Sequence, residues 1–291
     1  MNKPMKTIVV PTDLSREADH AIDVAIVIAR QMKAGIQLMH VVQSIYEKAY
    51  ASTASLPGEG RDALQAGIDK AEAAMADLMK KYAVEDVEIK PVVKVGSIFQ
   101  DLADNIVQVK ADVIILGTKG DSGLHEFFIG SHAEKVVRRS HCPVITVRNK
   151  IPDFKLKRIV FATDFTDKAD KLLNLLKQWQ QIAFFDIHLL YVNIPLHFAT
   201  TFTIEDRMDK FLKKHVGTTF TTAIINDYTE REGIQKYALK VGADLIVMLT
   251  HGREGLGHVI EGSIAEQIVN RANIPVLTYS LHTSEEIFLS T

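Results

Sequence analysis

The chain repeats itself, and this duplication restricts its fold more than any other feature of the sequence. TIVVPTDLS at residues 7–15 returns as RIVFATDFT at residues 158–166, an offset of 151 positions. GSHAEKVVRRSHCPVITV at residues 130–147 returns as GSIAEQIVNRANIPVLTY at residues 262–279, an offset of 132. Self-similarity of this length indicates two copies of one folding unit. We therefore expect two domains, the first half (residues 1–150) and the second half (residues 151–291), joined near the proline of NKIPDF.

The fall in offset from 151 to 132 locates a deletion. QLMHVV at residues 37–42 matches HLLYVN at 188–193 with the larger offset, whereas ADVIILGTKG at 111–120 matches ADLIVMLTHG at 243–252 with the smaller one. The second half is thus 19 residues shorter between its second and fourth strands. We expect most of one covering helix to be missing there.

Apolar runs alternate with helical periodicity within each copy. In the first half the strands are predicted at residues 7–10, 36–42, 87–95, 113–116 and 144–147, and the helices at 15–33, 60–82, 98–109 and 131–139. Runs of Val, Ile and Leu without polar alternation are typical of parallel strands covered on both faces. The predicted fold class is α/β: two tandem doubly wound domains, each an open five-stranded parallel sheet flanked by helices and Rossmann-like in outline. Ligands bind such sheets beyond the carboxyl ends of the strands, where the strand order reverses.

Composition and charge exclude several classes of protein. The chain has 47% apolar and 24% charged residues, a net charge of −2 and no basic block, so neither nucleic acid nor an anionic membrane is an expected partner. No run approaches the roughly 20 apolar residues of a membrane span. The start, MNKPMKTIVVPTDLS, lacks the apolar run of a signal peptide, and Cys142 has no second cysteine to pair with. We expect a cytoplasmic protein.

A glycine-rich segment follows the fourth predicted strand, with the spacing Gly117-x-x-Gly120-x9-Gly130-Ser131. Glycines let a backbone approach a ligand closely, and a helix starting at Ser131 would direct its positive dipole end at a phosphate. However, Ser131-x-x-Glu134 is also a capping box, which explains a helix start without any ligand. The spacing alone leaves both interpretations open.

Taken together, these motifs resemble the universal stress proteins of the UspA family. IVVPTDLS at the start, LMHVV in the second strand, ADVIILG before the glycines and HCPVITV after them occur in the family's order, and the resemblance extends over nearly the whole chain, twice. It implies an adenine nucleotide alpha hydrolase-like fold. One branch of the family binds ATP, with the glycine-rich loop and its serine on ribose and phosphates. In that branch the Asp after the first strand and the Val near the end of the second hold the adenine.

Carried over position by position, the resemblance implies an ATP site in the first half. Magnesium would accompany the nucleotide, held by phosphate oxygens and water. The expected nucleotide-binding residues are Pro11, Thr12, Asp13, Val41, Gly117, Thr118, Gly120, Gly130, Ser131 and His132. For Asp13 alone, a helix-capping role is the better explanation, and for Val41 alone, a core role. The whole set of residues in register favours the nucleotide site.

The second half departs from this pattern. Ala162 stands in the place of Pro11, and Leu249 stands in the place of Gly117. A leucine is bulky where the backbone should approach the sugar, and it resists positive φ. We expect the second pocket to be empty or to hold something less polar than a nucleotide.

The remaining motifs argue against efficient catalysis. The chain lacks a P-loop, a Gly-x-Ser-x-Gly elbow and zinc-ligand spacing, and no residue stands out as a general base, so at most slow ATP hydrolysis or autophosphorylation is expected. An ATP-binding stress-response protein, a non-catalytic scaffold for unidentified protein partners and an adenylating enzyme are the three alternatives. The third is the weakest, because its pyrophosphate-binding motifs are missing.

The last predicted strands, residues 143–147 and 275–279, are apolar and would lie at sheet edges. Family resemblance implies that such strands pair antiparallel across a two-fold axis. Because a short linker joins the two copies, we expect them to pair within one chain as an intramolecular pseudo-dimer. A homodimer of the whole chain is compatible with this arrangement but not required by it.

Overall fold

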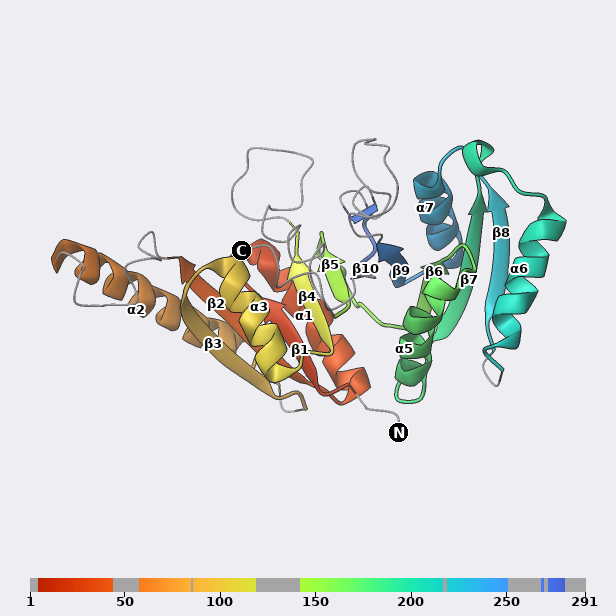
Figure 1. Cartoon of the computed structure of the whole chain (residues 1–291). Helices are drawn as coiled ribbons and strands as arrows, with labels where there is room; N and C mark the ends of the chain where they lie inside the picture. The colour runs from red at the N-terminus through yellow and green to blue at the C-terminus, as the bar shows by residue number, and fades with distance from the viewer. Residues whose placement is uncertain are drawn as a thin grey trace.

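The strands of both halves join into one continuous sheet in the computed structural model, which describes residues 5–43, 58–84, 86–118, 142–216, 219–250, 268–269 and 272–280. The strand order is β3-β2-β1-β4-β5-β10-β9-β6-β7-β8 (Figure 1). The strands of the first half are β1 (Thr7–Pro11), β2 (Gly35–Gln43), β3 (Ile89–Gly96), β4 (Val113–Gly117) and β5 (Val144–Val147). Those of the second half are β6 (Arg158–Ala162), β7 (Asp186–Asn193), β8 (Thr221–Asn226), β9 (Leu245–Thr250) and β10 (Val276–Ser280).

Helices cover both faces of this sheet. They are α1 (Arg16–Met32), α2 (Gly58–Lys81), α3 (Ile98–Val109), α5 (Asp170–Gln180), α6 (Thr201–Lys213) and α7 (Glu230–Val241), with short 3-10 turns η2 (Asp167–Ala169) and η3 (Pro195–His197). The predicted cap of the first helix is confirmed, because the Ser15 side chain accepts a hydrogen bond from Ala18 N. The helix predicted at residues 131–139 lies outside the described residues.

The predicted doubly wound α/β fold is confirmed in both halves. All described strand pairs within a half are parallel. On one face of the first half, buried residues of α1 and α2 pack on β1 and β2, and on the other face α3 packs on Val9, Met39 and Ile114. Strand order reverses between β1 and β4 in the first half and between β6 and β9 in the second. These two switch points are where the fold places ligands.

The deletion in the second half shortens a helix and does not remove it. α6 has 13 residues where α2, in the same place in the first half, has 24. Ile204 and Phe211 of α6 are both buried in the main core. The expectation that most of a covering helix is missing was therefore wrong, because the shorter helix still buries an apolar face.

The expected pairing of the two last strands is present within the chain. β5 and β10 run antiparallel, with Ile145 opposite Leu277, and the hydroxyl of Thr146 donates to Val276 O at 3.2 Å. The equivalent hydroxyl of Thr278 donates to Val144 O at 3.4 Å. The two halves are thus joined by backbone pairing as well as by the linker.

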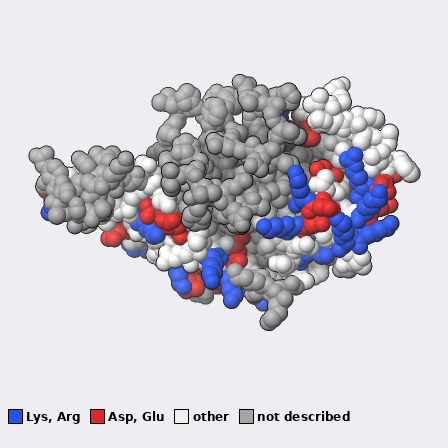
Figure 2. Space-filling model, viewed as in Figure 1, with Lys and Arg blue, Asp and Glu red and all other residues white. Residues whose placement is uncertain are grey.

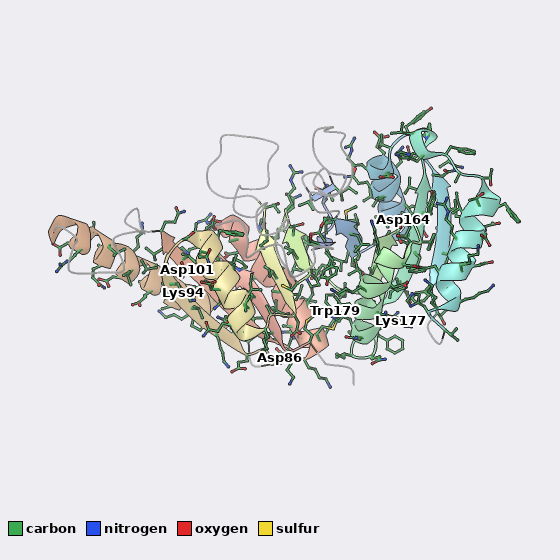
Figure 3. The ribbon with its side chains drawn as sticks, viewed as in Figure 1. Asp86, Lys94, Asp101, Asp164, Lys177 and Trp179 are labelled. Atoms are coloured by element: carbon green, nitrogen blue, oxygen red, sulfur yellow. The ribbon has the colours of Figure 1, made fainter. Side chains whose placement is uncertain are left out.

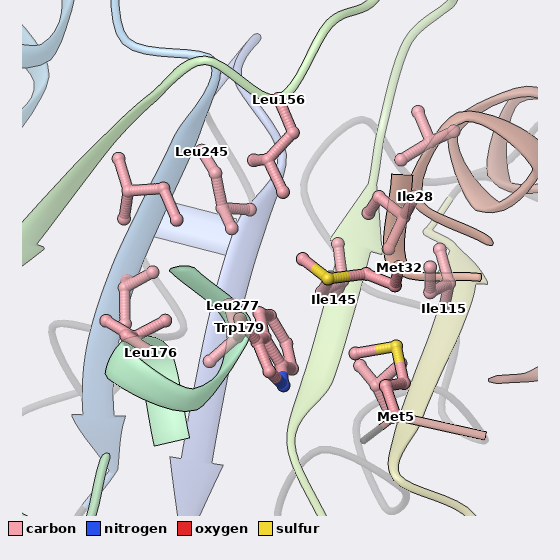
Figure 4. Close-up of a cluster of buried hydrophobic side chains, with 14 of the residues drawn as sticks. Met5, Ile28, Met32, Ile115, Ile145, Leu156, Leu176, Trp179, Leu245 and Leu277 are labelled. Carbon is pink, nitrogen blue, oxygen red and sulfur yellow. The ribbon is translucent and has the colours of Figure 1, made fainter. Parts of the chain in front are cut away.

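One hydrophobic core crosses this junction. Met32 and Ile145 of the first half belong to the same cluster of buried side chains as Trp179 and Leu277 of the second, and each is at most 2% exposed (Figure 4). Burial of apolar surface across the junction stabilises the relative placement of the halves, in addition to the strand pairing. On the face seen in Figure 2, Lys and Arg side chains are interspersed with Asp and Glu.

Candidate functional site

The carboxyl ends of three neighbouring strands form the candidate site in the first half. β1 lies between β2 and β4 in the sheet. Immediately after β1, Thr12 N donates to Met39 O of β2 at 2.8 Å, and immediately after β4, Thr118 N donates to Val147 O of β5 at 3.1 Å. Neighbouring strands are about 4.8 Å apart, so the Thr12–Asp13 turn and the Gly117–Thr118 segment flank the switch point at close range.

The turn after β1 holds Asp13 at the protein surface. Thr12 is buried, and its hydroxyl accepts from Leu14 N at 3.0 Å. Asp13 Oδ1 accepts from Ser15 N at 3.0 Å, and Leu14 between them has a φ of 65°. Because Ser15 is the residue that caps α1, this bond stabilises the turn before the helix and does not cap the helix itself. Asp13 itself is exposed, so its carboxylate can also accept a hydrogen bond from a ligand.

The second half builds the same turn from equivalent residues. The Thr163 hydroxyl accepts from Phe165 N at 3.1 Å, and Asp164 Oδ1 accepts from Thr166 N at 3.1 Å. Phe165 has a φ of 60°, which matches Leu14. Figure 3 shows Asp164 in the second half above Lys177, whereas Asp86, before β3, lies at the lower edge of the first half. The turn is thus a property of the repeated TD motif and is not by itself evidence of a ligand.

Val41 and Pro11 line the strand ends beside this turn. Val41 is partly buried, packs against the cluster that contains Met39 and Leu102, and lies opposite Lys94 in β3. Pro11 is partly exposed and lies opposite Met39. Val41 is therefore both part of the core and available as an apolar wall.

Gly117 and Thr118 are the described part of the predicted glycine loop. Gly117, in β4, lies opposite Val147 of β5, and its φ is not positive. Thr118 is buried. The remaining predicted loop residues, Gly120, Gly130, Ser131 and His132, lie outside the described residues. The structure thus brings together Pro11, Thr12, Asp13, Val41, Gly117 and Thr118 at one edge of the sheet.

One reason given for the weakness of the second site was wrong. Leu249 was expected to resist a positive φ, but the equivalent Gly117 has extended backbone, and Leu249 fits the strand β9 opposite Tyr279. Its side chain packs, partly buried, against the main core. The difference between glycine and leucine here is therefore the added side chain and not the backbone conformation.

The sequence patterns missed a second difference between the halves. In the second half, a Cβ atom at Gly233 of α7 would lie 2.5 Å from Val192 Cγ1, so this helix rests directly on the counterpart of Val41. In the first half the equivalent position is Asp101, whose carboxylate lies over Gly96 (φ 151°). The sequence alone could have revealed this replacement of aspartate by glycine, because the offset of 132 aligns Asp101 with Gly233. The α7 helix therefore contacts Val192 more closely than a residue with a Cβ atom would allow, although Val192, like Val41, is only partly buried.

The described residues offer neither a metal site nor a membrane span. Among the described residues, no three His, Cys, Asp or Glu side chains are grouped so that they could hold a metal ion. None of the described helices combines the length and the apolar character that crossing a membrane requires.

Comparison with known proteins identifies the repeated unit. The family model described as "Universal stress protein family" matches residues 4–148 and again residues 155–280. A universal stress protein of Methanocaldococcus jannaschii is 34% identical over 145 residues, covering 49% of this chain and 82% of that protein. A universal stress protein of Synechocystis is 24% identical over 294 residues, covering 94% of this chain and 100% of that protein.

A solved structure shows the same tandem fold. The crystal structure of a universal stress protein from Archaeoglobus fulgidus matches with a TM-score of 0.74 at 18% identity, covering 96% of this chain and 99% of that one. At this identity the likeness concerns the fold. The double match of the family model decides the family: this chain belongs to the universal stress proteins, with two copies of the family's domain in tandem.

Proposed function

We propose that the first half binds ATP at the carboxyl ends of β1, β2 and β4, and that the protein acts in the stress response through this binding. The observation that carries the proposal is the placement of the Thr12–Asp13 turn and of Gly117–Thr118 on the two sides of the switch point. This is where doubly wound sheets bind nucleotides. The resemblance of the sequence to the ATP-binding branch of the family supports the choice of ligand.

Each residue has a distinct role in this proposal. The exposed carboxylate of Asp13 accepts a hydrogen bond from the adenine amino group or a ribose hydroxyl. Val41 supplies an apolar wall, and the absence of a side chain at Gly117 lets the sugar approach β4. Backbone amides from Gly130 to His132 bind the terminal phosphates, and Mg²⁺ is held by phosphate oxygens and water.

The second half is proposed not to bind ATP. Leu249 adds a side chain where the first half has Gly117, and α7 lies against Val192 at Gly233. Ala162 also replaces Pro11. The proposal therefore assigns one nucleotide to each chain.

Efficient catalysis is not part of the proposal. The candidate carboxylate, Asp13, shares Oδ1 with the Ser15 amide and has no assigned role in proton transfer. Turnover is proposed to be limited to slow ATP hydrolysis or autophosphorylation. With a single cysteine, the chain suits a reducing cytoplasm, which is the proposed location.

Isothermal titration of the full chain with Mg-ATP tests this assignment. We expect one ATP per chain, and Asp13→Ala should weaken binding by about 10- to 100-fold, since a hydrogen bond to a charged group contributes about 1.5–3 kcal/mol. Asp164→Ala is the matched control, because it removes the same turn from the second half and should leave ATP affinity unchanged.

Three results would count against the proposal. If Asp13→Ala binds ATP with wild-type affinity, Asp13 does not belong to the binding site. A loss of binding in Asp164→Ala alone would place the nucleotide in the second half. If the wild-type protein neither retains nucleotide after native purification nor binds added ATP, the scaffold alternative would replace the proposed function.

A further inference from the structure

We propose that His40 is a positioning residue of the first-half site, because its ring fixes the orientation of the peptide group that joins Thr12 to Asp13. His40 lies in β2, one residue before Val41, and contacts the turn after the neighbouring strand β1. The inference rests on the proposed ATP site and names a residue that the glycine and aspartate motifs do not include.

The contact is a single hydrogen bond with a defined direction. His40 Nδ1 lies 2.8 Å from Thr12 O. A carbonyl oxygen only accepts, so Nδ1 must carry the proton, and this assigns the tautomer of the neutral ring. Side chains alternate along a strand, so His40 shares a face of the sheet with Ile36 and Leu38, opposite the face of Val41.

This bond completes a set of three that hold Thr12. Its amide donates to Met39 O at 2.8 Å, its hydroxyl accepts from Leu14 N at 3.0 Å, and its carbonyl accepts from His40. Every polar group of Thr12 is therefore engaged. The residue before Asp13 has little freedom to rotate.

The consequence for a ligand follows from the geometry of the peptide. In a trans peptide the carbonyl of Thr12 and the amide of Asp13 point in opposite directions, and the described residues contain no cis peptide. With the carbonyl held toward the His40 ring, the Asp13 N–H points away from it. No acceptor for this N–H is found in the described part of the chain. His40 thereby presents a backbone donor beside the Asp13 carboxylate.

The second half supports the same turn by other means. Tyr191 takes the place of His40 and is buried, and its ring stacks on Phe165 with centroids 6.3 Å apart and planes 8° apart. Phe165 in turn meets Phe211 edge-on at 5.6 Å. There the turn is stabilised through the side chain of Phe165, and the peptide before Asp164 has no equivalent hydrogen bond among the described residues. The hydrogen bond from a histidine to the turn is thus found in the half that keeps the nucleotide motif.

Three substitutions at His40 separate the hydrogen bond from the rest of the ring. His40→Asn keeps a donor near the position of Nδ1, His40→Gln moves the donor toward the position of Nε2, and His40→Leu removes it. We expect His40→Leu and His40→Gln to raise the Kd for Mg-ATP by about tenfold, the equivalent of one hydrogen bond. His40→Asn should stay within about threefold of the wild type.

Control measurements distinguish positioning from general destabilisation. His188 Nδ1 bonds Tyr237 Oη at 3.0 Å in the second half, so His188→Leu loses a comparable half-buried histidine contact and should bind ATP normally. Urea unfolding of each variant reports its stability separately from its affinity. A long-range ¹H–¹⁵N spectrum of the wild type should show His40 in its Nδ1-protonated tautomer.

The outcomes separate this inference from the proposed function. If the wild type binds no ATP, the proposed function fails and the role of His40 fails with it. If the wild type binds ATP but the Asn and Gln variants bind equally well, or lose affinity equally, the positioning role is overturned while the ATP site stands. The Asn and Gln pair retains this power even if His40→Leu does not fold.

Discussion

Gly233 shows how a single residue makes the packing of the second half differ from that of the first. It lies in the first turns of α7, where a Cβ atom would be 2.5 Å from Val192 Cγ1 and 3.2 Å from Asp227 Cβ. Gly67 in α2 offers a contrast, because a Cβ there would meet Val42 Cγ1 at an ordinary 3.6 Å. The two glycines differ in packing, although both lie within helices.

The same substitution should therefore have opposite effects at these two positions. Gly233→Ala should destabilise the protein by about 1–3 kcal/mol through overpacking. Gly67→Ala should stabilise it by about 0.5–1 kcal/mol through helix propensity. Urea unfolding midpoints measure both, and equal stabilisation by the two variants would contradict the close packing of α7 on Val192.

We expect His188 to make the stability of the protein depend on pH. Burial lowers the pKa of His188, and the charge of Arg158 lowers it further, while Asp186 acts in the opposite direction. The unfolded chain, with an ordinary pKa of about 6.5, then binds the proton first. This contribution to stability is present above that value and is lost as pH falls through the lower pKa of the folded state.

The expected result is a smaller pH dependence once His188 is replaced. The free energy of unfolding, measured in urea from pH 7 to pH 5, should fall less in His188→Asn than in the wild type. Carboxylates that titrate in the same range affect both proteins alike, so the difference isolates the histidine. Parallel curves would contradict the role assigned to His188.

At the scale of elements, the β5–β10 pair determines how the halves meet. Ile114 N donates to Pro143 O, and Thr118 N donates to Val147 O. The backbone polar groups of alternate β5 residues therefore point to β4, and those of Val144 and Thr146 point to β10. Thr146→Pro removes a donor from the junction and should let the halves separate. Ile145→Pro is the comparison, because the backbone amide that it removes points to β4 and not to β10.

Small-angle scattering measures this effect directly. The radius of gyration of Thr146→Pro should exceed that of the wild type. A Thr146→Val control should stay as compact as the wild type, because only the hydroxyl is lost. Unchanged scattering in Thr146→Pro would show that the shared core alone holds the halves together.

At the scale of the whole molecule, the shared core predicts cooperative unfolding. Met32, Leu156 and Trp179 belong to one buried cluster although they come from different halves (Figure 4). Neither half can unfold without exposing apolar surface of the other. Calorimetry should show one transition whose calorimetric and van't Hoff enthalpies agree, whereas two separated transitions would mean that the halves fold independently.

The sequence by itself determined the features that depend on local pattern. The repeat predicted two copies, apolar runs predicted the parallel strands, and Ser15 predicted the start of α1. The order of these elements then fixed the switch points and placed Asp13 and Gly117 beside them. These inferences succeeded because periodicity, capping and right-handed crossovers are encoded within short segments.

Only the tertiary structure decided how distant segments meet. The hydrogen bond from His40 to Thr12 spans 28 residues, and Gly233 meets Val192 across two elements of the second half. The retention of α6 and the extended backbone of Gly117 were likewise not predictable from propensity. Such contacts depend on the side chains that face one another across strands and helices, and this pairing exists only once the whole sheet has formed.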